Sequence, residues 1–174
     1  MLDSLITSKT RLRLLVKFFI NAANEGHLRG LATEFNESTN SIRKELNNLS
    51  EAGYLEKENV QNKVHYKANS KHPLFSALQE IVRKYIGLDT IVEKVLERMG
   101  NVKQIVVTGD YANGHDAGKI EITIVGEKLN EEYLDKLSSK IESLISREVF
   151  FTTSVHSINH GLIVFEDQSK KVDK

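Results

Sequence analysis

The feature that most constrains the fold is a change of hydrophobic period at Gly53. Before it, apolar residues recur at the spacing of an α-helix, and after it apolar and polar residues alternate as they do in β-strands. A glycine suits this junction because the residue after a helix is commonly left-handed, a conformation that other side chains resist. The sequence therefore predicts a helix that passes directly into a β-hairpin.

Two further helices are predicted ahead of this junction. The first runs from about Ser8 to Asn24 and is stopped by Gly26, with one apolar face made by Leu12, Leu15, Val16, Phe19, Ile20 and Ala23. The second runs from about Leu28 to Phe35 and buries Leu31, Ala32 and Phe35. The polar pair Asn36-Glu37 then breaks the pattern tightly before the third helix begins.

The third helix combines a buried stripe with a polar face. Ser38 or Thr39 can cap its start, and the stripe consists of Ile42, Leu46 and Leu49. At about 100° per residue, Asn40, Lys44 and Asn47 lie on the opposite side, flanked by Ser41 and Arg43. Amides, hydroxyls and cations of this kind suit base edges and phosphates.

Strand-like segments at 54–58 and 64–68 flank a polar turn at 59–63, so the hairpin forms a wing after the third helix. With the run LSEAGYLEKE, the segment Ser8 to Asn69 resembles the winged-helix domains of ArsR-like repressors. That resemblance implies binding to double-stranded DNA, with contacts from Thr39, Asn40, Ser41, Arg43, Lys44, Asn47, Gln61, Asn62 and Lys63. Arg29 is a further candidate for phosphate, while Glu51, Glu56 and Glu58 weaken the positive field. The alternative is a winged helix used only for protein contacts.

A connecting helix is predicted over 73–87, because Pro73 suits a first turn and an apolar stripe follows at Leu74, Leu78, Ile81, Val82 and Tyr85. In the repressors that this chain resembles, the first helix and the helix after the wing form the dimer contact. The resemblance therefore implies a homodimer. The alternative use of the stripe is to cover the core of the winged helix, and both uses are compatible.

The second half predicts a small mixed sheet with helices. A helix over 88–99 leads to Gly100, strands follow at 102–108 and 119–125, and Asn130 caps a helix through Ile145 with Tyr133, Leu134, Leu137, Ile141 and Leu144 inward. A strand at 148–155 and an edge strand at 162–165 complete the sheet. The expected class is α/β (α+β), with a winged-helix domain at 1–72, a connecting helix at 73–87, the second domain at 88–166 and a disordered tail at 167–174.

The segment VVTGDYANGHDAGKIEITIVGE resembles the core of minimal nucleotidyltransferases. In that family a glycine and a serine cradle a triphosphate, and two aspartates on the next strand hold Mg²⁺. Here Gly109 and Gly114 match the glycines, Asp110 stands at the serine position, and Lys119 and Glu121 stand at the aspartate positions. Only Glu148 is available as a third acid.

These substitutions reverse the charges that the chemistry needs. One unfavourable charge pair at about 4 Å is worth on the order of 4 kcal/mol at an effective dielectric constant near 20, or roughly a thousandfold in rate. We therefore expect Lys119 to pair with Glu121 or Asp110, and a nucleotidyltransferase-like domain that is not an enzyme. The rival hypothesis is an active nucleotidyltransferase that uses Glu121.

No cofactor and no metal site are expected. The sequence contains no cysteine, which excludes disulfides and thiolate metal ligands. His156 and His160 are four residues apart, but the segment between them is typical of a loop, and His115 and Asp116 are the only conceivable further ligands.

Charge and hydropathy favour a cytoplasmic regulator. Residues 1–86 contain 13 lysines and arginines against 9 acidic residues, and residues 87–174 contain 11 against 15. An anionic partner is thus favoured at the first half alone. No membrane span or signal-peptide core is evident. The leading hypothesis is a homodimeric transcriptional regulator whose second domain senses an effector or binds a partner; a pure protein-interaction module is the other alternative.

Overall fold

The computed structural model describes residues 2–168, and the side chains of residues 3 and 135 lie outside that description. Helices and strands are mixed along the chain, which confirms the predicted α+β class. The contacts divide the chain into two units: unit 1 contains Met1–Tyr85 with Asn113–Asp116, and unit 2 contains Ile86–Ala112 with Ala117–Lys174. The chain therefore leaves unit 2 after residue 112 and returns to it at residue 117.

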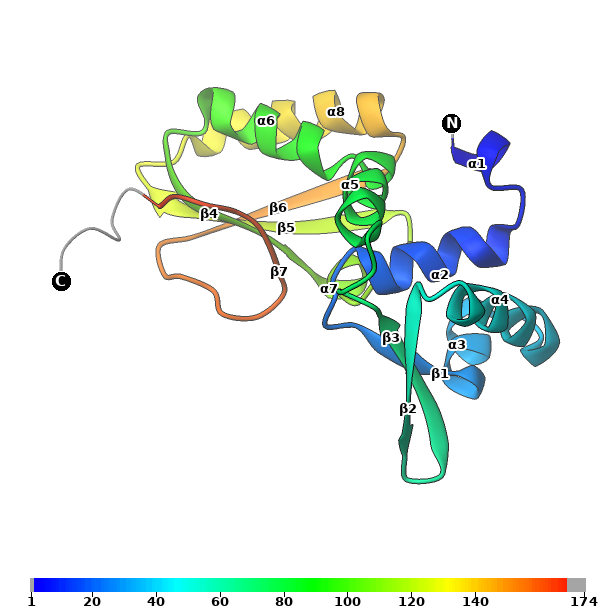
Figure 1. Ribbon diagram of the computed structural model, residues 1–174. Coiled ribbons are helices and arrows are strands. Elements are labelled where there is room, and N and C mark those ends of the chain that lie inside the picture. The colour runs from blue at the N-terminus through cyan, green and yellow to red at the C-terminus, as the bar shows by residue number, and fades with distance from the viewer. Residues whose placement is uncertain (1, 169–174) are drawn as a thin grey trace, which may run out of the picture. The chain divides into compact units, whose positions relative to one another are not determined.

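Unit 1 is a winged helix (Figure 1). Its helices are α1 (Leu2–Leu5), α2 (Lys9–Phe19), α3 (Leu28–Phe35) and α4 (Thr39–Glu51), followed by α5 (Phe75–Ile86), whose last residue is assigned to unit 2. Strands β1 (Glu25–His27), β2 (Leu55–Val60) and β3 (Lys63–Ala68) form an antiparallel sheet in the order β1-β3-β2. Its core consists of fully or almost fully buried apolar side chains, notably Leu14, Phe18, Phe19, Leu31, Ile42 and Leu46.

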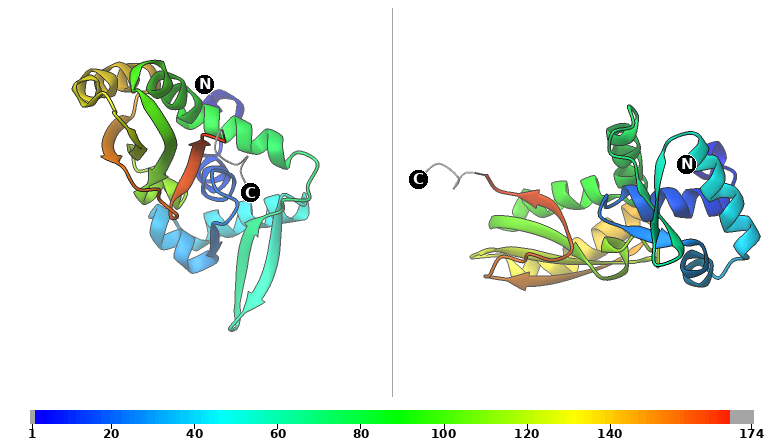
Figure 2. Two further views of the ribbon diagram at one scale, coloured as in Figure 1. Left: turned by 90° about the vertical axis from the view of Figure 1, so that its left-hand side faces the viewer. Right: turned by 60° about the horizontal axis from the view of Figure 1, so that its bottom comes forward.

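Unit 2 is a four-stranded mixed sheet with two long helices. It contains α6 (Leu88–Arg98), β4 (Asn101–Thr108), α7 (Gly109–Ala112), β5 (Lys119–Glu127), the short 3₁₀ helix η1 (Glu131–Tyr133), α8 (Leu134–Ile145), β6 (Glu148–Ser154) and β7 (Leu162–Glu166). The strand order is β6-β5-β4-β7, with β5 parallel to β6 and the other pairs antiparallel. Helices α6 and α8 lie side by side on one face of the sheet (Figures 1 and 2).

The alternation along β5 places its side chains on two different surfaces. Ile120, Ile122 and Ile124 are almost completely buried in the core. Lys119 and Glu121 point to the other side, because successive side chains of a strand face opposite ways. The core of unit 2 therefore fixes the direction of both charged residues.

The first predicted helix is too long at its end. Helix α2 stops at Phe19, and Ala23 is exposed. Asn21 accepts a hydrogen bond from the backbone N–H of Ala23 at 3.1 Å, and Asn24 donates to the carbonyl oxygen of Lys17 at 2.9 Å. These local bonds compete with the helical ones and end the helix. The residues that follow form β1, a strand that the sequence does not predict.

Three other details of the prediction are wrong. Asn130 makes no side-chain cap for α8, because the 3₁₀ turn η1 lies between them and the N-cap position of α8 is Tyr133. Leu144, which is predicted to face inward on α8, is 57% exposed. Helix α5 begins at Phe75 rather than Pro73, because His72 closes a turn with Leu74 and Phe75 first.

Two expectations concern the chain's surroundings and its end. Among the described residues, none of the helices is long and apolar enough to cross a membrane. The disordered tail predicted at 167–174 falls for the most part on residues 169–174, which lie outside the description.

Candidate nucleic-acid interface

Helix α4 begins at a well-formed cap. The hydroxyl oxygen of Ser38 accepts a hydrogen bond from the backbone N–H of Ser41 at 3.2 Å, as one of the two predicted caps requires. At the other end Gly53, at φ +80°, donates to Ser50 O, and Tyr54 donates to Leu49 O. Both ends of the helix are thus fixed before the chain enters the wing.

The polar face of α4 is exposed throughout. We use this name for Thr39, Asn40, Ser41, Arg43, Lys44 and Asn47, all of which are exposed in unit 1. Ile42, Leu46 and Leu49 on the opposite side are buried. The predicted amphipathic pattern of the helix is confirmed, and the structure leaves its polar face open within this unit.

A partly buried ion pair joins α4 to α2 on the side opposite the polar face. Arg11 on α2 donates from Nε to Oε2 of Glu45 at 2.8 Å, and Ser8 donates to Oε1 of the same carboxylate at 2.8 Å. Burial raises the pKa of Glu45, but the hydrogen bonds from Ser8 and Arg11 outweigh it and hold that pKa below its ordinary value. Sequence patterns give no signal for this contact, because 34 residues separate Arg11 from Glu45.

The wing presents a two-residue tip. Val60 pairs with Lys63, so Gln61 and Asn62 alone form the turn. Both have positive φ, 48° and 63°, which is the type I′ geometry that matches the twist of a hairpin. Gln61, Asn62 and Lys63 are all exposed at this tip, where the hairpin extends beyond the helices of its unit (Figure 1).

The cations of unit 1 divide into paired and unpaired ones. Lys67 lies 3.8 Å from Glu56 and 4.0 Å from Glu58, so those acids face a cation of the wing itself. Arg43, Lys44 and Lys63 form no ion pair within residues 2–168. The positive charges of the polar face and of the wing tip are therefore not neutralised by neighbouring side chains.

The two glycines of the altered nucleotide site are assigned to different units. Gly109 begins α7 in unit 2, and a Cβ atom there would lie 2.5 Å from Oε2 of Glu121. Gly114 belongs to the segment assigned to unit 1, where a Cβ atom would lie 2.4 Å from Lys17 O. Asp110 follows Gly109 in α7. The glycine predicted to lie under a triphosphate thus contacts a carboxylate.

The charged residues of β5 neutralise each other. Lys119 Nζ lies 3.6 Å from Glu121 Oε1, which confirms the expected pairing, and 4.0 Å from the centre of the Phe150 ring. The register places Glu148 beside Lys119 and Phe150 beside Glu121. Glu148 is therefore not adjacent to Glu121 across the strands, and residues 2–168 contain no group of three metal-ligating side chains placed to hold an ion.

The histidine pair of the second half lies in a loop. His156 and His160 are exposed between β6 and β7, as the sequence indicates, and Ser154 Oγ accepts from the backbone N–H of His156 at 3.1 Å. The loop is held to the sheet by Gln104, whose side-chain oxygen accepts from Ile158 N at 3.1 Å. This arrangement lacks the helical spacing that would direct both imidazoles to one ion.

Comparisons with known proteins find two solved structures that resemble part of the chain. The antimony-specific transcriptional repressor AntR is 22% identical at a TM-score of 0.37 over 55% of this chain and 78% of its own. Sso10a-2, a DNA-binding protein from Sulfolobus solfataricus, is 17% identical at a TM-score of 0.34 over 49% of this chain and 92% of its own. No family model and no curated protein matches. Because both superpositions are loose, the function proposed below rests on this chain's own residues.

Proposed function

We propose that this chain is a DNA-binding transcriptional regulator that places α4 in the major groove. The observation that carries the proposal is the exposure of the whole polar face of α4, backed by a buried stripe and followed by a wing. An α-helix fits the major groove, where asparagine amides and arginine or lysine can recognise base edges. Arg43 and Lys44 supply cations that no acid of the described chain neutralises.

The wing supplies a second contact in this proposal. Lys63 carries a charge at its tip, and Gln61 and Asn62 carry amide groups. Thr39, Ser41 and Asn47 contribute the remaining polar groups of α4. Contacts to phosphate position a protein on the duplex, whereas contacts to bases specify the sequence. Lys63 fits the first role, and Asn40 and Asn47 fit the second.

We propose a homodimer because a single winged-helix unit offers few contacts to phosphate. Leu74 and Ile81 on α5 are 49% and 43% exposed, and a hollow of about 310 Å³ in unit 1 is lined by Leu15, Leu49, Tyr54 and Leu78, among others. Apolar surface of this kind marks protein contacts. Two winged-helix units joined through α2 and α5 would bind two half-sites of one operator.

We propose that unit 2 has a nucleotidyltransferase-like frame that serves as a sensor or interaction module without catalysis. The mixed sheet, the glycine turn before β5 and the alternating charged residues on β5 support the likeness. The ammonium of Lys119, paired with Glu121, opposes the binding of Mg²⁺. The carboxylate of Glu121, which lies against Gly109, opposes the binding of a triphosphate. Incubation with labelled nucleoside triphosphates and Mg²⁺ should give no transfer; transfer that disappears in Glu121→Gln would contradict this part of the proposal.

The DNA-binding proposal is tested by fluorescence anisotropy with duplex DNA from upstream of the chain's own coding sequence. The logarithm of the binding constant should fall linearly with the logarithm of salt concentration, because bound cations release counterions from phosphate. A scrambled duplex of equal length and composition measures the non-specific part. Equal affinity for both duplexes would leave only non-specific binding, and no binding at low salt would support the protein-interaction alternative.

A further inference from the structure

The wing hairpin carries different charges on its two faces. Strands β2 and β3 pair residue by residue along its whole length (Figure 1). Because successive side chains of a strand point to opposite faces, the paired residues divide into two sets. The inner face consists of Leu55, Lys57, Asn59, Val64, Tyr66 and Ala68, and the outer face consists of Glu56, Glu58, Val60, Lys63, His65 and Lys67.

The inner face continues the core of unit 1 and approaches α4. Leu55, Tyr66 and Ala68 are buried on it. Burial raises the pKa of the Tyr66 phenol above its ordinary value, and the positive charge of Arg43 on α4 partly opposes that rise. Arg43 is itself exposed, so a cation of the polar face lies near the Tyr66 phenol.

Lys57 is the cation of the inner face. It is exposed, and its Nζ lies 5.8 Å from the centre of the Tyr66 ring. The face of an aromatic ring attracts a cation, and a buried ring holds its own position, so this contact gives Lys57 a defined direction. No acid within residues 2–168 forms an ion pair with Lys57. Lys57 and Arg43 therefore bring two unpaired cations to the surroundings of one tyrosine.

Away from the tip, the outer face is acidic. Lys67 Nζ lies 3.8 Å from Glu56 and 4.0 Å from Glu58, so two carboxylates share one lysine. Glu25 of β1 pairs with Lys67 across the strands and adds a third carboxylate, 3.6 Å from His65 Nδ1. A phosphate brought to this part of the outer face would be repelled, because it would meet more anions than cations.

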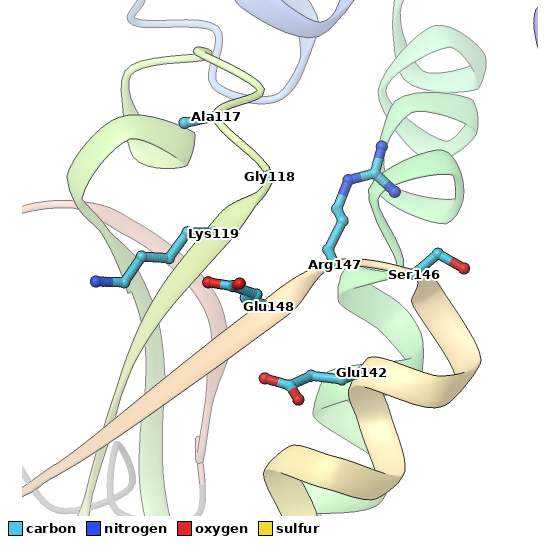
Figure 3. A pocket seen from close by; sticks show the side chains of 7 residues that line it. All are labelled: Ala117, Gly118, Lys119, Glu142, Ser146, Arg147 and Glu148. Atoms are coloured by element: carbon cyan, nitrogen blue, oxygen red, sulfur yellow. The ribbon is translucent and has the colours of Figure 1, made fainter.

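A hollow in unit 2 also contains a cation but suits a phosphate less well. Arg147 lines it, and its Nε donates to the hydroxyl oxygen of Tyr111 at 3.1 Å. Glu142 and Glu148 line the same hollow (Figure 3). The cation there is already bonded and is accompanied by two carboxylates, whereas within residues 55–68 the inner face of the wing carries no acid.

We propose that the DNA duplex lies along the inner face of the wing, where Lys57 contacts a backbone phosphate beside the contact of Arg43 and Tyr66 positions Lys57. The inference rests on the proposed binding of α4 to DNA and adds the side of the wing that the duplex occupies. Sequence patterns contain no signal for it, because Lys57 stands between Glu56 and Glu58 in a run of net negative charge. The pleat of β2 directs both acids to the other face.

Lys57→Ala and Lys67→Ala test the proposal as a matched pair, because each removes one exposed lysine from a strand of the same hairpin. Fluorescence anisotropy measures the salt dependence of duplex binding by the full chain. In Lys57→Ala the slope of log K against log salt should become less steep by about 0.9, the contribution of one phosphate contact. In Lys67→Ala the slope should stay as it is in the unaltered chain. An unchanged slope in Lys57→Ala, or an equal change in both variants, would overturn the proposal.

Failure of this inference and failure of the proposed function give different results. If Arg43→Ala/Lys44→Ala makes the slope less steep and Lys57→Ala does not, α4 binds DNA and the duplex does not follow the inner face. If the unaltered chain binds no duplex at low salt, both proposals fail.

The positioning role of Tyr66 is tested by a double-mutant cycle with Lys57. Tyr66→Leu removes the ring and should weaken DNA binding by about two- to fivefold, the range expected when a cation loses an aromatic contact at an exposed site. The same change should have no effect in Lys57→Ala, and Tyr66→Phe, which keeps the ring, should bind as the unaltered chain does. Equal weakening in both backgrounds would overturn the positioning role. If a thermal melt shows that Tyr66→Leu is unfolded, Tyr66→Phe and Lys57→Ala still decide whether the ring and the lysine act as proposed.

Discussion

Arg11 on α2 and Glu45 on α4 form a hydrogen-bonded ion pair, with 2.8 Å between Nε and Oε2. The carboxylate is largely buried, while Arg11 is 42% exposed. Glu45 and Lys44 are neighbours on this helix, but Glu45 is buried and Lys44 is exposed to solvent. The pair therefore fixes the rotation of α4 and, with it, the direction of the polar face.

Glu45→Gln should destabilise the chain by about 1.5–3 kcal/mol, the usual contribution of a hydrogen bond to a charged group. The ordinary carboxyl pKa of 4.5 applies to the unfolded state, and the folded pKa is lower. Glu45 thus stabilises the fold fully above its unfolded pKa, and this contribution is lost as pH falls through the folded value. Denaturant melts between pH 3 and 7 should show a shallower acid loss in Glu45→Gln, with exposed Glu51→Gln as the control; identical pH profiles would contradict the role of the pair.

The wing tip should tolerate a better turn. Gln61 holds a left-handed conformation that Asn and Gly adopt more easily, so Gln61→Asn with Asn62→Gly should raise stability by about 0.5–1 kcal/mol. Thermal melting measures this effect. Gln61→Ala is the control, because it keeps the unfavourable φ and removes only the amide, so it should not raise the melting temperature. A lower melting temperature in the Asn-Gly variant would mean that the tip has another geometry.

Ser146 offers a comparable test in unit 2. It closes α8 at φ 56° and ψ 39°, the left-handed position that glycine usually occupies. Ser146→Gly should therefore raise the free energy of unfolding by about 0.5–1 kcal/mol. Ser143→Gly, within the same helix, should lower it by a similar amount. Destabilisation by Ser146→Gly would show that the hydroxyl contributes more than the backbone strain costs.

The proposed dimer predicts a defined loss. Ile81→Glu places a charge on the exposed apolar stripe of α5 and should convert the dimer to a monomer in light scattering, with DNA affinity reduced at least about tenfold. Ser76→Glu, at an exposed position elsewhere on α5, is the control. A mass that is independent of concentration and equal in all three proteins would argue against this interface.

Much of unit 1 is predictable because its signals are local. The bounds of α3, the cap of α4 by Ser38 and the buried stripe of α4 all follow from periodicity and capping over a few residues. Strand β1 is not predictable in this way, since a three-residue strand has no period and exists only through its pairing with β3. The end of α2 depends likewise on side-chain bonds from Asn21 and Asn24 that compete with helical ones.

For the altered nucleotide site, too, the sequence predicts local contacts but not contacts between distant segments. The Lys119–Glu121 pair is predictable because two residues on one strand share a face. The register of β6 against β5 is not encoded locally, and it places Phe150 rather than Glu148 beside Glu121. The assignment of Gly114 to unit 1 depends on a contact with Lys17, a residue far away in the sequence. Motif spacing alone therefore identifies residue types without showing which of them meet.

The central claim, that the polar face of α4 binds DNA, is tested most directly by the salt dependence of binding in Arg43→Ala/Lys44→Ala. If both cations contact phosphate, the slope of log K against log salt should become less steep by about 2, since each contact contributes about 0.9. Lys136→Ala, an exposed lysine of α8, should leave the slope unchanged. The account predicts that reduction together with weaker binding at every salt concentration; an unaltered slope and affinity in the double variant would contradict it.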